Sequence, residues 1–158
     1  MSLPAAVADS VVEVAEIAGT TVAAHFGDPA REYEGARHGV GLAHRSQRAL
    51  VRVSGSDRYK FLQALLTNDV SGLAVGEGQQ SLFLDNKGHV RGVLDLWAED
   101  DSIMVGCDVG FAESVLPDLE RYVLAADVSI EDRRGHDTVI AVHGTGSEDS
   151  VPRTGIGM

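Results

Sequence analysis

Three short apolar segments, residues 80–85, 90–97 and 103–107, follow one another with only brief polar links between them. Residues 86–88 (Asn-Lys-Gly) are typical of a hairpin turn, and residues 99–101 join the second segment to the third. Links this short favour antiparallel neighbours, because parallel strands need a long crossover connection. The pattern excludes a doubly wound parallel sheet and predicts an α+β domain, with helices packed on a largely antiparallel sheet.

The segment before these strands is predicted to be another strand followed by a helix. Residues 50–53 alternate, so that Val51 and Val53 share one face. Ser56 is a candidate N-cap for a helix over residues 57–66. Apolar side chains at helical spacing predict a buried face on this helix, made of Phe61, Leu62, Leu65 and Leu66.

Two further helices are predicted near the N-terminus. Residues 4–17 carry apolar side chains every three or four positions, which fits one face of a helix. Asp28 is a favourable N-cap for a second helix, which begins at Pro29 and ends near Arg37. Phe26, in the turn between the two helices, is expected to be buried.

The segment after the third strand is predicted to hold one helix and one hairpin. The helix covers residues 111–124, where Pro117 should kink or divide it because proline lacks an N–H. The hairpin pairs residues 128–131 with residues 138–143. The chain from Gly144 onward is rich in glycine, serine and charge, and is expected to be unpacked.

Charge and cysteine content narrow the class of protein. The 158 residues carry a net charge of -11, which repels phosphate backbones and anionic lipid, so neither nucleic acid nor membrane binding is expected. No apolar run reaches the roughly 20 residues of a spanning helix. A single cysteine forms no intrachain disulfide, and this favours a reducing, cytoplasmic setting.

Four segments together resemble a known family. They are residues 38–46 (HGVGLAHRS), residues 53–70 (which end in LLTNDV), residues 85–90 (DNKGHV) and residues 141–144 (AVHG). In these sequence motifs the chain is similar, over residues 24–146, to the folate-binding family that contains the glycine-cleavage T-protein (GcvT-like aminomethyltransferases) and YgfZ-type proteins.

Two positions depart from the aminomethyltransferase pattern. The aspartate that supports methylene transfer in those enzymes corresponds to Arg91, and an expected tyrosine corresponds to Gln80. A guanidinium cannot act as a carboxylate, so the comparison argues against glycine-cleavage chemistry. Residues 84–90 and 105–108 also look closer to the YgfZ branch. Members of that branch bind a tetrahydrofolate and assist iron–sulfur cluster assembly or repair.

The resemblance therefore implies a tetrahydrofolate-binding, YgfZ-like accessory protein. Two alternatives stay open: an aminomethyltransferase of the glycine cleavage system, and an interaction module that retains only the fold. No catalytic or metal-binding residue is predicted. The residues proposed to bind folate are Asn68, Asp69, Gln80, Arg91, Arg48 and Cys107. Simpler interpretations exist, since Asn68 and Asp69 can stop a helix and Cys107 can be a small buried hydrophobe.

The resemblance also implies an organisation and a set of partners. Residues 1–23 are expected to form an N-terminal helical extension, residues 24–146 a folate-binding-like domain, and residues 147–158 a flexible tail. Family members are longer than this chain, so it is expected to hold only part of a folate site. A C-terminal half or iron–sulfur client proteins are the implied partners beside the folate itself.

Overall fold

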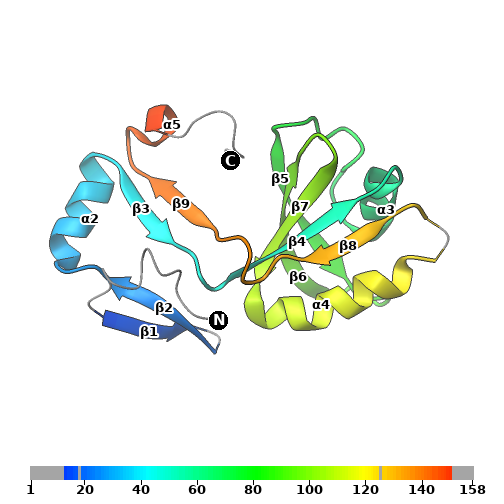
Figure 1. Ribbon diagram of the computed structural model, residues 1–158, viewed down its shortest axis with the longest axis horizontal. Helices are drawn as coiled ribbons and strands as arrows, with labels where there is room; N and C mark the ends of the chain where they lie inside the picture. The colour runs from blue at the N-terminus through cyan, green and yellow to red at the C-terminus, as the bar shows by residue number, and fades with distance from the viewer. Residues whose placement is uncertain (1–12, 18, 125, 151–158) are drawn as a thin grey trace.

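The computed structural model describes residues 13–17, 19–124 and 126–150. They form two lobes (Figure 1), which we call the main lobe (β4 to β8, with α3 and α4) and the peripheral lobe (β1 to β3, α2, β9 and α5). In chain order the elements are β1 (Glu13–Ile17), β2 (Thr20–His25), α2 (Pro29–His38), β3 (Gly41–His44), β4 (Arg48–Ser54), α3 (Arg58–Leu65), β5 (Gly78–Leu84), β6 (Val90–Ala98), β7 (Ser102–Asp108), α4 (Val109–Tyr122), β8 (Ser129–Asp132), β9 (Ile140–His143) and α5 (Ser147–Ser150).

The main lobe is built on one five-stranded sheet in the order β5-β6-β7-β4-β8. All of its neighbouring strands are antiparallel. The consecutive strands β5, β6 and β7 form a meander through the short polar links, as predicted. The predicted fold class, α+β with helices on a largely antiparallel sheet, is therefore confirmed.

Helices α3 and α4 cover one face of this sheet, and their apolar side chains make the core with it. The alternation predicted for β4 is confirmed, because Val51 and Val53 are buried while their neighbours are only partly covered. Leu62 of α3 and Leu119 of α4 are fully buried against these strands. Each such side chain contributes roughly 1.5–3 kcal/mol through the hydrophobic effect. The opposite face carries the polar residues described below.

Secondary structure at the N-terminus differs from the prediction. Residues 13–17 form strand β1 and pair antiparallel with β2, so the helix predicted over residues 4–17 is wrong there. Residues 4–12 lie outside the described residues. Gly19, at φ 75°, makes the tight turn, and β-branched Val14 and Ile17 suit a strand. Phe26 is exposed, so its predicted burial is also wrong.

The predicted hairpin of residues 128–131 and 138–143 does not form. Strand β8 pairs with β4 at the edge of the main sheet, whereas β9 pairs with β3 in the peripheral lobe. The chain between them passes from one lobe to the other (Figure 1). The expectation of an unpacked chain from Gly144 is wrong for residues 144–150, while residues 151–158 lie outside the described residues. The Gly146 amide donates to the Gly39 carbonyl oxygen at 3.5 Å, and α5 follows.

The ends of the predicted helices are partly confirmed. The Asp28 carboxylate accepts hydrogen bonds from the amides of Ala30 and Arg31, which confirms it as the N-cap of α2. Ser56 is not the N-cap of α3, because that position is Asp57 and no side-chain cap is formed. Pro117 lies inside α4 without dividing it.

Candidate functional site

The Thr67-Asn68-Asp69 segment ends α3 and attaches the following loop to β5. The Thr67 amide donates to the Leu82 carbonyl oxygen at 3.2 Å, and the Leu82 amide donates to Thr67 Oγ1 at 3.1 Å. Asn68 Nδ2 donates to the Gln80 carbonyl oxygen at 2.6 Å. Side chains that bond to the backbone stop the helix, and they place Asn68 beside Gln80.

Asp95 joins Gln80 to Arg48 on the sheet face that the helices leave uncovered. Gln80 and Asp95 are opposite each other in the β5–β6 register, and Gln80 Nε2 donates to Asp95 Oδ1 at 3.0 Å. The Arg48 guanidinium donates to the other carboxylate oxygen of Asp95 and, at 2.9 Å, to Asp108 Oδ1. We call these residues with Asn68 the Asp95 cluster. It brings together three of the six predicted site residues.

The Arg48–Asp95 ion pair is the least exposed part of this cluster. Both side chains are largely removed from water, while Asp108 is exposed. A pair withdrawn from water needs good geometry and further hydrogen bonds, and Gln80 and Asp108 supply them. Asp95 was missed at the sequence level. The sequence feature that could have identified it is a lone carboxylate inside the apolar run of residues 93–97.

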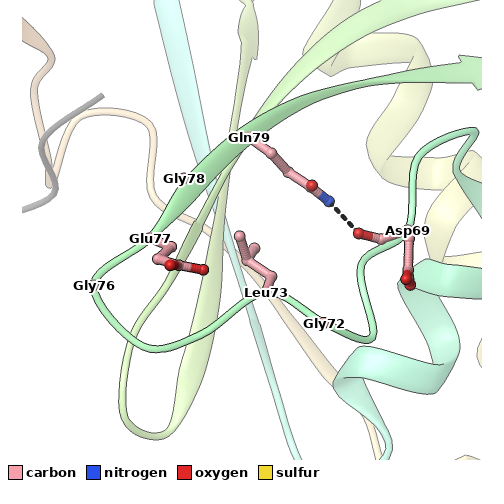
Figure 2. Close-up of a pocket in the computed structure, with 7 residues that line it drawn as sticks. All are labelled: Asp69, Gly72, Leu73, Gly76, Glu77, Gly78 and Gln79. Atoms are coloured by element: carbon pink, nitrogen blue, oxygen red, sulfur yellow. Dashed lines mark hydrogen bonds between the residues drawn. The ribbon is translucent and has the colours of Figure 1, made fainter.

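Asp69 lines a separate depression at the start of β5 (Figure 2). Gln79 Nε2 donates to the Asp69 carbonyl oxygen at 2.9 Å across this cavity of about 590 Å³. The Ser71 hydroxyl and amide both donate to the Asp69 carboxylate, and they hold its pKa below its ordinary value. The lining residues are Asp69, Gly72, Leu73, Gly76, Glu77, Gly78 and Gln79. The cavity is polar, with two carboxylates and no aromatic ring.

Arg91 and Cys107 lie apart from the Asp95 cluster. Arg91 is exposed near the start of β6, and its closest carboxylate is that of Asp118 on α4 at 3.7 Å. Cys107 is buried in the core opposite Ala49. Burial raises the pKa of the Cys107 thiol to about 11, so it is protonated near neutral pH. Its position is that of a small buried hydrophobe.

The accessible polar groups define what the Asp95 cluster can do. Asn68, Gln80 and Asp108 are exposed, so a ligand can reach their amides and carboxylate directly, whereas the Asp95 side chain is only 13% exposed. Trp97 and Met104, on the same sheet face, are already buried. The arrangement suits a small ligand that offers N–H donors to these oxygen acceptors.

The part of the chain that the structure describes contains no group of three His, Cys, Asp or Glu side chains that could hold a metal ion. None of its helices has the length and apolar character needed to cross a membrane.

Comparison with known proteins gives consistent results. A family model described as "GCVT N-terminal domain" matches residues 7–154. The chain is 27% identical over 146 residues to an aminomethyltransferase of Mycobacterium leprae, covering 90% of this chain and 39% of that protein. It is 28% identical over 134 residues to that of Bacillus subtilis, covering 84% of this chain and 37% of that protein.

A solved structure shares the fold. The glycine cleavage system aminomethyltransferase T from Bartonella henselae superimposes with a TM-score of 0.77 at 19% identity, covering 88% of this chain and 38% of that one. The chain therefore spans about two fifths of the length of the relatives it matches.

Proposed function

This chain belongs to the GCVT N-terminal domain family, and on that premise we propose that it is the N-terminal part of a folate-dependent, aminomethyltransferase-type protein. The observation that carries the proposal is the family match over residues 7–154, together with relatives named as aminomethyltransferases. Because the chain spans under two fifths of those relatives, the transfer reaction is proposed only together with the segments they carry in addition.

This proposal differs from the expectation drawn from the sequence, which preferred a YgfZ-like accessory protein over an aminomethyltransferase. The relatives found are aminomethyltransferases, so the alternative becomes the main proposal and the YgfZ-like role in iron–sulfur assembly becomes the second candidate. One observation still favours the second candidate. Arg91, which the family resemblance aligned with the catalytic aspartate, is a guanidinium that contacts Asp118 and no cluster residue.

The chemistry of the Asp95 cluster supports binding of a reduced folate. The pterin ring of tetrahydrofolate presents adjacent N–H donors, which a carboxylate and an amide oxygen accept. Arg48 and Gln80 hold the Asp95 carboxylate in one orientation, so the acceptor does not have to be ordered by the ligand.

Titration calorimetry with tetrahydrofolate tests this assignment. Asp95→Asn should weaken binding about tenfold, or about 1.4 kcal/mol, because it removes one charged acceptor. Asp101→Asn is the matched control, since Asp101 also pairs with an arginine of β4, Arg52 at 2.8 Å, but outside the cluster. The absence of binding heat at millimolar folate, with the remaining segments of a relative supplied, would refute the proposal.

An activity assay separates the two candidates. Methylene-tetrahydrofolate formation is measured with the other glycine-cleavage components, using the completed protein. An aminomethyltransferase turns over, whereas an accessory protein binds folate without turnover. Arg91→Asp restores the carboxylate that the family resemblance places there. Turnover gained only in this variant would assign the natural protein to the accessory role.

A further inference from the structure

Asp108 stands at the N-cap of α4 but does not cap the helix. Its backbone, at φ -69° and ψ 142°, has the extended conformation that N-cap residues adopt. A capping carboxylate would accept from the amide of Gly110 or Phe111, yet no side-chain cap bond is made at this helix start. Asp28 makes such a cap on α2, whereas Asp57 makes none on α3 and, at ψ 5°, lacks the extended backbone. Asp108 therefore has the backbone of a cap without the cap itself.

The Asp108 carboxylate instead covers one edge of the Arg48 guanidinium. Asp108 Oδ1 accepts from Arg48 Nη1 at 2.9 Å, while Arg48 Nη2 donates to Asp95. The Asp108 side chain is 66% exposed and that of Arg48 only 13%. Arg48 thus has one edge held by a withdrawn carboxylate and one edge held by a carboxylate in water. An ion pair with so exposed a partner contributes little to stability.

Two positions therefore compete for the Asp108 carboxylate. Rotation of the side chain carries it from Arg48 to the amides of Gly110 and Phe111, because the backbone already has the capping conformation. An aspartate cap stabilises a helix at least as much as an exposed ion pair stabilises a fold. The positive end of the helix dipole favours the carboxylate there as well. Losing the bond to Arg48 is thus offset by gaining the cap.

We propose that Arg48 is a binding site for the carboxylate of a small monocarboxylate ligand, and that this ligand displaces Asp108 to the N-cap of α4. A guanidinium edge matches a carboxylate in shape and charge, and the Nη1 edge already holds one. Asp95 keeps the guanidinium oriented from its other edge. With Asp108 turned away, the Arg48–Asp95 pair is neutral and accepts one carboxylate, whereas the net charge of -11 disfavours polyanions.

The inference goes beyond the proposed function, because it uses the edge of Arg48 that faces away from Asp95 and involves no folate. It assigns to Asp108 the role of an internal competitor for that edge. Ligand occupancy at Arg48 is thereby coupled to the first turn of α4.

An NMR titration of the full chain with sodium acetate tests the proposal, with sodium chloride at equal ionic strength as the reference. Acetate should shift the Arg48 Nε–H signal and the amide signals of Gly110 and Phe111 along one saturation curve. At saturation these two amides should exchange about threefold more slowly, because the cap is then made. Chloride should produce neither effect. A saturable response to sodium sulfate but not to acetate would overturn the carboxylate assignment.

Substitutions of Asp108 separate the site from the displacement. Asp108→Asn keeps a good N-cap but loses the ion pair, so acetate should bind Arg48 about fivefold more tightly. Its Gly110 and Phe111 amides should be protected before acetate is added and should not respond to it. Asp108→Ala should bind acetate without any protection of these amides. Asp101→Asn is the matched control, since it removes an exposed carboxylate from Arg52 on the same strand, and it should behave as the unsubstituted chain.

Three results would overturn the proposal. The first is an unsubstituted chain that gives no acetate response beyond that of chloride, even where Asp108→Asn binds. The second is equal tightening in Asp101→Asn, which would reflect reduced negative charge alone. The third is protection of the α4 amides by acetate in Asp108→Ala. Because no folate is present, a chain that binds acetate as expected but not tetrahydrofolate supports the Arg48 site and refutes only the folate assignment.

Discussion

The two lobes have similar backbone pairing but very different burial. Strands in both lobes form antiparallel ladders. Among the buried hydrophobic residues of the described chain, however, only Val22 belongs to the peripheral lobe. Helix α2 buries no residue at all. Hydrogen-bonded secondary structure is therefore present in both lobes, while the apolar burial that stabilises it is concentrated in one.

This difference predicts two levels of stability within one chain. Two-stranded sheets are marginal in water without further packing, and the peripheral lobe consists of two of them with the poorly buried helix α2 and the four-residue helix α5. It should therefore open locally while the main lobe stays folded. The single tryptophan, Trp97, is buried in the main lobe, so its fluorescence reports that lobe alone.

The largest effect is expected from removing a core side chain of the main lobe. Leu94→Ala leaves a cavity beneath α3 and α4, and should cost about 3–5 kcal/mol of the free energy of unfolding. Urea denaturation followed by Trp97 fluorescence measures it. Val22→Ala in the peripheral lobe is the comparison, and should leave the Trp97 transition in place. An equal shift from both variants would mean that the lobes unfold as one unit.

Two glycines with similar backbone geometry, one in each lobe, allow the stability of the lobes to be compared in the same way. Gly55 has φ 104° and Gly144 has φ 110°, and a Cβ on either would lie 2.1 Å from a backbone oxygen. Alanine at either site should cost roughly 2–3 kcal/mol locally, from backbone strain and steric overlap. Gly55→Ala should shift the Trp97 transition, because Gly55 sits between β4 and α3. Gly144→Ala should instead accelerate amide exchange in β3 and β9 only.

The success of sequence-based prediction follows the same division between the lobes. The meander of β5, β6 and β7 was predictable because its strands are joined by short turns with recognisable residues. The pairing of β3 with β9 joins Gly41 to His143 across the whole main lobe, and no local pattern encodes such a contact. Residues 128–131 and 138–143 therefore looked like a hairpin, although each strand has a distant partner.

The candidate site was predicted only in part, for a related reason. Arg48 and Gln80 converge because both bond Asp95, which was not among the predicted residues, and Asn68 joins them through the Gln80 carbonyl oxygen. The core position of Cys107 agrees with the simpler interpretation as a small buried hydrophobe, because β7 is buried from Ser102 to Cys107. Arg91 was less predictable, because the β5–β6 register shifts next to it and changes which side chains are neighbours.

The N-cap of α2 gives a smaller and more local effect. Asp28→Ala removes the acceptor for two backbone amides, and should cost about 1 kcal/mol of helix stability. Because α2 buries nothing, the loss should appear as faster amide exchange within α2 and leave the Trp97 transition unchanged. Asp28→Asn retains an acceptor and serves as the control. A shift of the main-lobe transition in Asp28→Ala would contradict independent opening.

The smallest effect is expected from the protonation of His44, which lies on β3 and bonds Thr138 Oγ1 through Nε2 at 2.9 Å. Partial burial lowers the pKa of His44 from its ordinary value of 6.5, so the folded peripheral lobe favours the neutral ring. The unfolded state then binds more protons below pH 6.5, and the stabilisation present above that pH is lost as the pH falls through the lower, folded pKa.

Amide exchange in β3 and β9, corrected for intrinsic rates, should therefore show less protection at pH 5.5 than at pH 7.5. His44→Gln should flatten this pH dependence in the peripheral lobe and leave the Trp97 transition as it was. Suppose that His44→Gln were found to flatten the pH dependence of stability equally in both lobes. Protonation at β3 would then be coupled to the core of the main sheet, and the two lobes would share one cooperative transition.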